Sequence, residues 1–511
     1  MGPCEGIAVG PDDSLQAAVD ARPEGTTFCL RAGIHRLARA VPKNHQRFIG
    51  EGAGTILSGA RVLRASEARR DHGGRYYWDR QTQESNPHGT LLGPGYTEAP
   101  NPGDVYNEEL FVTPSGASGD LPRRYQRVTS LSELGPAKWF FDYARDRIYM
   151  ADDPARLGLI ETSVLPAAIA APAEAPSQGV VIEGVVVEKY ASAAQQAAVG
   201  GSGALIWNIR FITVRHNHGV GAELGPGTLM ENCKIHHMGQ MGLSGGGNAT
   251  TRPTVLRSTE VAYNNVLSFD ADWEAGGAKF ARTYGYGMIV ENSWFHHNRG
   301  GGLWFDIDNF DVVIRSNRFE ANDRWGVQYE VSRQAKIYWN EVFGTTNGPE
   351  DFLFNGSAIF VHNSAEVEVY DNLVYDNDNG IFVREDRQAT RWAQDSFREG
   401  LPHVEHVRIH NNDLRMLSGF TGMRVERGDA RDYWRPSTVR FDGNIYRLND
   451  GEGRFLGAGN DVYTFERWQE LGNDRTGALR SAATDGSLPN RARAFATSAY
   501  GAQPAVAQPH P

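Results

Sequence analysis

The sequence lacks long hydrophobic runs and an excess of basic charge. No apolar run approaches the ~18 residues that a membrane-spanning helix needs, so a membrane is not expected as a partner. The chain of 511 residues carries 51 Lys and Arg against 62 Asp and Glu, a net charge of −11 at pH 7. This balance argues against nucleic acid and anionic membrane surfaces as main partners. It also disfavours a strongly anionic polymer as substrate, unless basic residues are concentrated locally.

Cysteine is scarce, with three residues in the chain. Cys4 and Cys29 can pair and staple the N-terminus, whereas Cys233 falls inside a repeated segment at a small position typical of buried packing. The opening MGPCEG is too short and too polar for a signal peptide, and folded-looking sequence follows at once, as in a mature secreted protein whose leader has been removed. Together with a Cys4–Cys29 bridge, this predicts an exported protein.

Glycine is abundant, with 58 residues, and one phrase recurs after polar turn residues, for example GLWFDID from Gly302. In each copy of this repeated segment (called a phrase below), the first and third residues after the opening residue are mostly apolar. The side chains of the second and fourth residues point to the opposite face of the strand. This alternation predicts a strand with one buried and one exposed face. If the phrases stack, their exposed fourth positions form a column of Glu223, Gly246, Ala281, Asp306, Glu330, His362, Arg384 and Glu426.

A second period comes from small or polar residues placed two residues before an apolar one. From Ser293 onward it recurs at spacings of 24, 23, 32, 40 and 32 residues. A unit of about two dozen residues that repeats and stacks is a solenoid, and its strands are too short for a βα repeat, which leaves the parallel β-helix. Asparagines of this column are expected to satisfy turn backbone groups. The column comprises Gly184, Cys233, Thr259, Ser293, Asn317, Asn340, Asn372, Asn412 and Asn444.

Four regions are expected along the chain. Residues 1–59 form an N-terminal cap and the first coils, with a short amphipathic helix over 12–21 covering the open end of the stack. Residues 60–165 lose the period and are interpreted as a small β-rich insertion of antiparallel hairpins. Residues 166–450 form the parallel β-helix with the active-site loops. Residues 451–511 form a C-terminal cap, with a helix in TFERWQELG, and a loosely ordered tail.

Long loops gather around one strand column. Extra residues occur between Asn264 and Gly277, between Thr345 and Ser357, and between Asp386 and His403, while other corners stay tight. Loops that are added to one face of a repeat scaffold usually mark its binding face. We therefore expect the functional site on this column.

Several segments resemble a known family. These are GLWFDIDN with RSNRFEANDRWGVQYEVS, PEGTTFCLRAGIHRL with RFIGEGAGTILSGARVL, and WFFDYARDRIYM. They resemble secreted bacterial right-handed parallel β-helix repeat proteins of the pectin-lyase-like superfamily, over most of residues 4–475. The resemblance implies an all-β fold, a single right-handed parallel β-helix, and a carbohydrate bound along one sheet by a hydrolase, lyase or epimerase. The polygalacturonase pattern of NTD, DD, GHG and RIK and the WxDH-type calcium site of pectate lyases are missing, so no residue roles are carried over.

Two carboxylates of the column are the predicted catalytic pair. Asp306 and Glu330 fall on adjacent coils, about 4.8 Å apart at the backbone, and like carboxylates this close leave a proton donor beside a base. Glu274, on the loop that opens onto this strand, is the predicted third carboxylate. The alternatives are a solvated strand face or a calcium site formed by Asp306 and Asp308. No cofactor is predicted, and calcium is left open.

A larger set is predicted to bind substrate. Trp273 and Trp304 are expected to stack on sugar rings, although either aromatic can instead be packed under the loops. Lys279, His362 and Arg384 flank the acidic pair; they either serve a lyase as bases and carboxylate binders or act as charge partners of Asp306 and Glu330. The complete set is Lys279, Trp273, Trp304, Asp308, Gln328, His362, Arg384 and Asp272.

The leading functional hypothesis is a secreted glycoside hydrolase that acts on a poly- or oligosaccharide with the carboxylate pair. The first alternative is a polysaccharide lyase or epimerase that uses the Lys, Arg and His side chains of the same face. The second is a non-catalytic carbohydrate-binding β-helix. All three share a saccharide partner.

Overall fold

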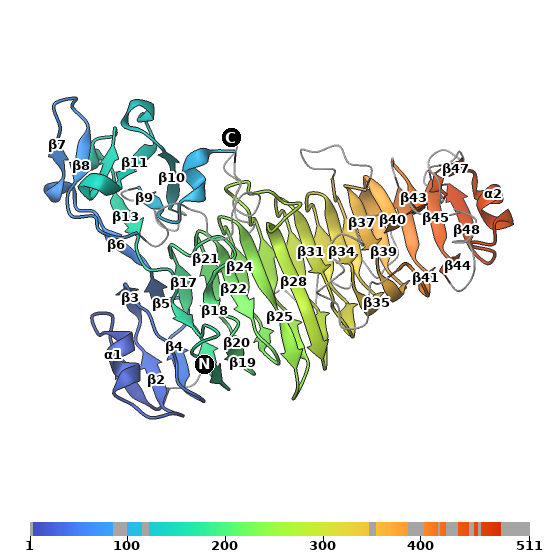
Figure 1. Ribbon diagram of the computed structural model, residues 1–511, viewed down its shortest axis with the longest axis horizontal. Coiled ribbons are helices and arrows are strands. Elements are labelled where there is room, and N and C mark those ends of the chain that lie inside the picture. The colour runs from blue at the N-terminus through green and yellow to red at the C-terminus, as the bar shows by residue number, and fades with distance from the viewer. Residues whose placement is uncertain are drawn as a thin grey trace.

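The computed structural model describes residues 4–84, 100–114, 122–346, 354–386, 403–416, 419–425, 438–448, 454–457 and 461–481. Most of them form an elongated solenoid of stacked coils, in which a typical coil contributes one strand to each of three sheets of mainly parallel strands (Figure 1). We call these sheets A, B and C, in the order in which a coil passes through them. The predicted all-β parallel β-helix is therefore confirmed.

The strands are short and follow one another in register along each sheet. Sheet A contains β1 (Ile7–Val9), β2 (Thr27–Leu30), β4 (Arg47–Gly50), β16 (Val181–Glu183), β20 (Asn208–Arg210), β23 (Leu229–Glu231), β26 (Thr254–Arg257), β29 (Met288–Glu291), β32 (Val312–Arg315), β35 (Arg333–Tyr338), β38 (Ala365–Tyr370), β41 (Val407–His410) and β44 (Val439–Asp442). Sheet B contains β3 (Gly33–Arg36), β5 (Thr55–Ser58), β17 (Val186–Glu188), β21 (Thr213–Arg215), β24 (Lys234–His236), β27 (Glu260–Ala262), β30 (Trp294–His296), β33 (Arg318–Glu320), β36 (Glu341–Phe343), β39 (Leu373–Asn377), β42 (Asp413–Met416), β45 (Ile445–Leu448) and β48 (Ala478–Ser481).

Sheet C carries the recurring phrase and is parallel except for its last pair. It contains β14 (Ile169–Ala170), β18 (Ala197–Gly200), β22 (Val220–Leu224), β25 (Met241–Ala249), β28 (Gly276–Gly285), β31 (Gly301–Asp306), β34 (Trp325–Glu330), β37 (Ser357–His362), β40 (Asn379–Glu385), β43 (Thr421–Val425), β46 (Phe455–Leu456) and β47 (Val462–Tyr463).

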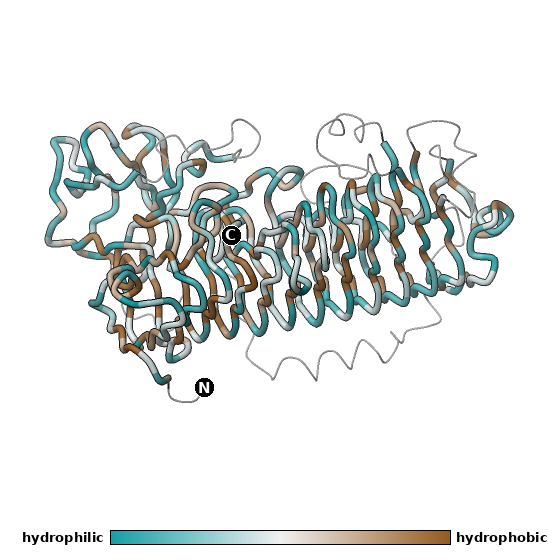
Figure 2. Tube along the Cα trace, turned by 60° about the horizontal axis from the view of Figure 1, so that its bottom comes forward, coloured by the Kyte–Doolittle hydropathy of each residue, from teal (hydrophilic) through white to brown (hydrophobic). Residues whose placement is uncertain are grey.

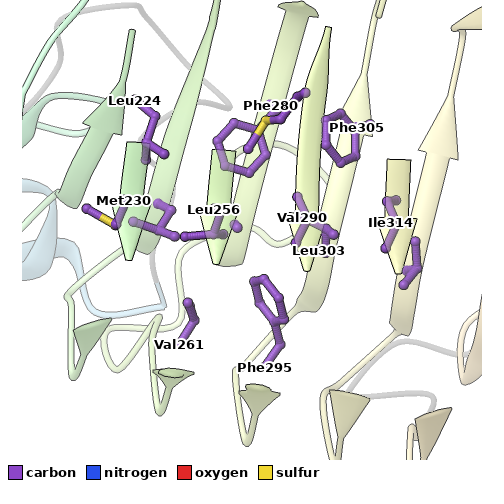
Figure 3. Packing of buried hydrophobic residues seen from close by; sticks show 14 of the residues in the cluster. Leu224, Met230, Leu256, Val261, Phe280, Val290, Phe295, Leu303, Phe305 and Ile314 are labelled. Atoms are coloured by element: carbon purple, nitrogen blue, oxygen red, sulfur yellow. The ribbon is translucent and has the colours of Figure 1, made fainter. Parts of the chain in front are cut away.

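The core lies inside the coils, where every second strand residue points. Apolar and polar residues alternate along each turn (Figure 2). On sheet C the inward residues include Phe280 and Phe305, whose rings lie 5.4 Å apart, and across the core they face residues such as Val290 and Phe295 (Figure 3). Each such buried side chain contributes roughly 1.5–3 kcal/mol relative to an exposed one. Because each inward side chain stacks on a similar side chain of the next coil, the solenoid has one continuous hydrophobic core.

The predicted asparagine ladder is present at the turn between sheets A and B. Asn340, for instance, accepts from the backbone N–H of Asn317 at 2.9 Å and donates to the carbonyl of Ile314 at 2.9 Å and to Asn372 Oδ1 at 3.0 Å. Each side chain therefore satisfies backbone groups that the turn would otherwise leave buried without partners. Cys233 occupies the same column as a buried free thiol, as expected.

Residues between the first coils and the main solenoid form a separate sheet with its own hydrophobic core. Its order is β6 (Ala60–Val62), β13 (Leu159–Ser163), β9 (Leu110–Thr113), β10 (Arg123–Val128), β11 (Lys138–Asp142), β12 (Arg147–Met150), β8 (Tyr76–Trp78) and β7 (Arg69–Arg70), and all pairs but β10–β11 are antiparallel. It contacts the solenoid through buried ion pairs, including Glu109 with His218 Nδ1 at 2.7 Å and Glu161 with Lys189 at 2.5 Å.

Both ends of the solenoid carry a short helix (Figure 1). Helix α1 (Leu15–Asp20) begins after Ser14, whose side chain accepts from Ala17 N, and α2 (Phe465–Glu470) begins after Thr464 and buries Trp468. Cys4 and Cys29 form a disulfide next to α1, which confirms their pairing. Among the described residues, neither helix has the length and apolarity to cross a bilayer.

Candidate active site

The outward residues of sheet C form the expected column in its central part. Register pairs join Ala281 to Asp306, Asp306 to Glu330, Glu330 to His362, and His362 to Arg384. The column therefore places two acidic side chains, Asp306 and Glu330, next to two basic ones, His362 and Arg384, on neighbouring strands about 4.8 Å apart.

The expected alignment is wrong at the N-terminal end of the column. Glu223 pairs with Ser244, and Ser244 with Lys279, so Glu223 lies in the adjacent column, two residues out of register. At the other end Arg384 pairs with Arg424, and Glu426 lies outside the described residues. Gly246 does pair with Ala281, so the first shift lies between β22 and β25; the second lies between β40 and β43, where Gly422 pairs with Phe382 and not with Gly380.

Asp306 is held by a lysine from the preceding strand. Lys279 Nζ lies 2.9 Å from Asp306 Oδ2 and 3.1 Å from Glu274 Oε1, and donates to the carbonyl of Trp273 at 2.7 Å. The side chains of Lys279 and Asp306 are only 8% and 13% exposed. Burial, together with the charge of Glu330, raises the pKa of Asp306 to about 6, against the opposing effect of Lys279. The lysine itself stays protonated, because its two carboxylate partners outweigh burial and raise its pKa.

Glu330 is surrounded by donors. Its Oε2 accepts from Trp304 Nε1 at 2.9 Å and from Gln328 Nε2 at 2.8 Å, and its Oε1 lies 2.8 Å from His362 Nδ1. Burial alone would raise the pKa of Glu330, but His362 and the other donors outweigh burial and lower it. Glu330 is therefore ionised at neutral pH.

His362 links Glu330 to a further carboxylate. Its Nε2 lies 3.0 Å from Asp386 Oδ2, and its ring stacks on Phe360 at 5.2 Å. Burial would lower the pKa of His362, but the carboxylates of Glu330 and Asp386 outweigh this effect and raise it to about 9. The imidazole therefore carries a proton at neutral pH, between two carboxylates.

Asp386 is a site residue that the sequence analysis did not identify. It accepts from Asn363 Nδ2 at 2.9 Å and lies 3.1 Å from Arg384 Nη2, while its own N–H donates to Asn363 Oδ1 at 3.0 Å. The sequence contained a signal for Asp386. It lies two residues after Arg384, and Arg384 pairs with His362, so continuing the alignment of β37 with β40 by two residues places Asp386 near His362. Arg384, expected to flank Asp306 and Glu330, pairs with Asp386 instead.

The outer face of sheet C is not an exposed face. Trp304, expected as an exposed stacking platform, is only 7% exposed, and Lys279 Nζ lies 3.7 Å from the centre of its ring. The expectation of an exposed Trp304 is wrong, because a second hydrophobic cluster covers this face; it contains Trp304, Trp325, Phe354, Phe360, Phe382 and Leu456. Trp273, on the loop before β28, is half-buried and is the better placed of the two expected platforms.

Two predicted substrate-binding carboxylates have protein partners. Asp272 forms an ion pair with the buried Arg324 of the turn before β34, a residue that the sequence analysis missed. Asp308 is buried and accepts from the hydroxyl of Tyr284. Asp306 and Asp308 are therefore held by different partners, and no group of three His, Cys, Asp or Glu within the described part of the chain is placed to hold a metal ion. The predicted loop segments 347–353 and 387–402 lie outside the described residues.

Comparisons with known proteins agree with this architecture. Residues 197–387 match the family model described as a right handed beta helix region, whereas a search of curated proteins found no match. Among solved structures, the complex of XylC with xylose is 12% identical, with a TM-score of 0.62 over 91% of this chain and 82% of that one. A PL6 family polysaccharide lyase from Pseudopedobacter saltans is 9% identical, with a TM-score of 0.47 over 95% and 94% of the two chains.

A third similar structure is the A-module of the mannuronan C-5 epimerase AlgE4 from Azotobacter vinelandii, which is 11% identical, with a TM-score of 0.44 over 88% of this chain and 93% of that one. At such low identity the likeness concerns the fold alone. The fold is a right-handed parallel β-helix.

Proposed function

We propose that the protein is a glycoside hydrolase that cleaves a neutral poly- or oligosaccharide with Asp306 and Glu330. The observation that carries the proposal is the pairing of these two carboxylates, in register on β31 and β34 and facing the same side. Side chains that leave neighbouring strands about 4.8 Å apart at the backbone can hold their carboxyl groups at the ~5 Å separation of retaining glycosidases, which form and then hydrolyse a glycosyl–enzyme ester.

Asp306 is suited to the role of nucleophile. Its Oδ2 is bound by Lys279, while its Oδ1 has no hydrogen-bond partner among the described residues. With a pKa of about 6, its carboxyl group is mostly ionised at neutral pH. In the proposed first step Oδ1 attacks the anomeric carbon, and the bond between that carbon and the leaving oxygen breaks.

Glu330 is suited to the role of acid and base because it shares a proton with His362. Both of its oxygens accept hydrogen bonds, and one is from the protonated imidazole at 2.8 Å. Negative charge that develops on the leaving oxygen draws the shared proton through Glu330 onto that oxygen. In the second step Glu330 takes a proton from water, the water oxygen bonds to the anomeric carbon, and Asp306 is released.

The charges around the pair favour a neutral sugar over a uronate. Lys279 is bound by Asp306 and Glu274, and Arg384 by Asp386. His362 lies between Glu330 and Asp386. A uronate carboxylate in this column would have to displace one of these internal pairs, at an energetic cost of a few kcal/mol. Lyases and epimerases need a free cation for that carboxylate, whereas Lys279, His362 and Arg384 each have a carboxylate partner among the described residues.

Chemical rescue tests both the reaction and the roles. Aryl glycosides of neutral sugars would be screened first, and the variants Asp306→Gly and Glu330→Gly would then be assayed with azide on the best substrate. We expect azide to rescue both variants. Asp306→Gly should release a glycosyl azide of inverted anomeric configuration, and Glu330→Gly one of retained configuration, because azide then attacks the glycosyl–enzyme ester.

The opposite assignment of configurations would exchange the two roles. Full activity of both variants would remove the carboxylate pair from the mechanism. An unsaturated uronate product, detected by its ultraviolet absorbance, would mean a lyase, and saccharide binding without turnover would mean a binding scaffold.

We further propose that neither step needs a metal and that the protein is exported. Three of the four carboxylate oxygens of Asp306 and Glu330 that a cation could use are already engaged, by Lys279, by Trp304 and Gln328, and by His362. Dialysis against EDTA should therefore leave kcat/KM unchanged, whereas a loss that calcium restores would contradict the first proposal. The Cys4–Cys29 disulfide supports export, because such bonds persist in oxidising compartments.

A further inference from the structure

A second surface feature lies on sheet A, near the C-terminal end of the solenoid. It is a cavity of about 450 Å³, lined chiefly by Glu368, Arg408, His410, Arg440, Asp442 and Thr476. These residues come from β38, β41 and β44 and from the turn before β48. Asn411, at the adjoining corner between sheets A and B, also lines it. Because this corner is the one that sheet C does not help to form, the cavity lies away from the carboxylate column.

The cavity contains two arginines in register. Arg408 pairs with Glu368 on one side and with Arg440 on the other, as backbone neighbours about 4.8 Å apart. Glu368 is engaged by His410 at 3.1 Å, and Arg440 by Asp442 at 2.6 Å. Arg408 has no ion pair or hydrogen bond among the described residues, and it is exposed. Like charges opposite each other in a sheet are destabilising, unless an anion lies between them.

A guanidinium pair of this kind matches a defined ligand chemistry. The planar forks of arginine bind carboxylate and sulfate or phosphate oxygens in bidentate fashion. The whole protein is acidic, with a net charge of −11, so this local pair stands out against its surroundings. The cavity therefore fits an anionic group.

An exposed tryptophan lies on the same corner, two coils away. Trp339 is 52% exposed and has a left-handed backbone with φ of 55°. The corner residues of the neighbouring coils are the smaller Ser316, Asp371 and Asn411, while Phe211 occupies an equivalent corner with φ of 52°. A bulky residue there costs roughly 1–2 kcal/mol of backbone strain, and burial does not offset that strain because half of the side chain faces water. A large exposed ring of this kind is suited to stacking on a sugar.

We infer that this face binds an acidic saccharide, with Arg408 and Arg440 holding its carboxylate or sulfate group and Trp339 stacking on one of its sugar rings. Along the corner, Trp339 lies two strand spacings or about 10 Å from Asn411, and Arg408 lies three residues before Asn411, about 10 Å farther across sheet A. The site anchors the protein to an acidic polysaccharide while the carboxylate column stays accessible on sheet C. The inference is independent of the proposed hydrolysis, because it uses none of the residues of that column.

Binding without turnover tests it. The Asp306→Asn variant, used as the parent, would be run in native gels containing polygalacturonate, dextran sulfate or neutral dextran, and in a gel without polysaccharide to correct for charge. We expect retardation by polygalacturonate if the site takes carboxylates, by dextran sulfate if it takes sulfate esters, and none by dextran. Arg408→Gln and Trp339→Ala should each weaken binding about tenfold or more, since each removes a principal contact.

Two matched variants control for charge and for exposed aromatic surface. Arg39→Gln removes an exposed positive charge near the N-terminus, and Phe211→Ala removes a ring that is 50% exposed at an equivalent corner, five coils away. Neither should change binding. No retardation of the parent by either acidic polymer, or equal loss in Arg408→Gln and Arg39→Gln, would overturn the inference. Loss in Arg408→Gln without loss in Trp339→Ala would also overturn it, because the site would then bind anions and not saccharides.

Discussion

At the scale of single residues, the candidate site is a chain of alternating charges with little solvent. Lys279, Asp306, Glu330, His362 and Asp386 follow one another through contacts of 2.8–3.0 Å, except that Asp306 and Glu330 meet as like charges. Buried ion pairs contribute little net stability because each ion loses its hydration. This row of charged side chains is therefore better explained by its effect on the pKa values of Asp306, Glu330 and His362 than by a contribution to stability.

The first prediction concerns the pH dependence of hydrolysis. Asp306 must be ionised to attack, so kcat/KM should fall as pH drops below the pKa of its carboxyl, about 6. His362 must hold the shared proton, so kcat/KM should fall again above its pKa of about 9. A profile measured from pH 4 to pH 11 (chosen to bracket both limbs) should be bell-shaped with a plateau between these values. A single alkaline optimum would contradict this assignment of roles.

The second prediction concerns the stability that His362 provides. Its pKa in the folded protein, about 9, lies above the 6.5 of a free imidazole, so its contribution is complete below pH 6.5 and is lost as pH rises through 9. A shift of this size corresponds to roughly 3 kcal/mol. Urea unfolding should therefore show His362→Gln destabilised more at pH 6 than at pH 10, by about that amount.

His410 offers a matched control for that measurement. It also contacts a glutamate, Glu368 at 3.1 Å, but its side chain is 28% exposed. Solvent screens such a pair, and surface pairs contribute at most about 1 kcal/mol. His410→Gln should show a small and nearly pH-independent effect, and an equal effect of both substitutions would refute the role assigned to His362.

At the scale of elements, the turn between sheets A and B holds the coils in register. The ladder runs from Asn317 through Asn340, Asn372 and Asn412 to Asn444, and each of these side chains accepts from the preceding coil and donates to the next one. A slip of one residue would move every core side chain to the other face, so these side chains fix the register.

The third prediction tests the ladder. Asn340→Ala leaves the backbone N–H of Asn317 and the carbonyl of Ile314 buried without their partners. An unsatisfied buried group costs about 1–3 kcal/mol, so we expect a loss of at least about 2 kcal/mol in the free energy of unfolding. Asn292→Gly is the control, because Asn292 is an exposed corner residue with φ of 51° that glycine tolerates, and its stability should change little.

The elements were largely predictable because the sequence repeats them. Gly302 and Gly326 open successive phrases, and Asn317 and Asn340 mark successive turns, so period and register could be inferred together. The burial of Trp304 could not be inferred. It depends on Phe354, which comes from the turn before β37, and on Trp325, the first residue of β34, whose ring covers the outer face.

At the scale of the whole molecule, the strands of the solenoid bring together residues of neighbouring coils. This explains why Asp306 and Glu330 could be paired from sequence, since they are 24 residues apart on adjacent coils. It also explains why the pairing of Asp272 with Arg324 could not be inferred. The loop before β28 carries Asp272, and it reaches past the adjacent coil to the turn before β34, where Arg324 lies. Sequence period thus predicts contacts along the sheets, whereas contacts made by loops above them require the structure.

The last prediction follows from this one-dimensional arrangement. The Cys4–Cys29 bridge closes a loop at the N-terminal end, with a sequence separation of 25 residues, far from the carboxylate column. Closing such a loop stabilises a fold by about 3 kcal/mol, but in a solenoid each coil contacts only its neighbours, so the effect stays local. The double variant Cys4→Ala, Cys29→Ala should therefore show faster hydrogen exchange in β1, β2 and α1, with unchanged exchange in β31 and β34. Its activity at 25 °C should match that of the parent, and loss of protection in β31 or β34 would mean that the solenoid unfolds as one cooperative unit.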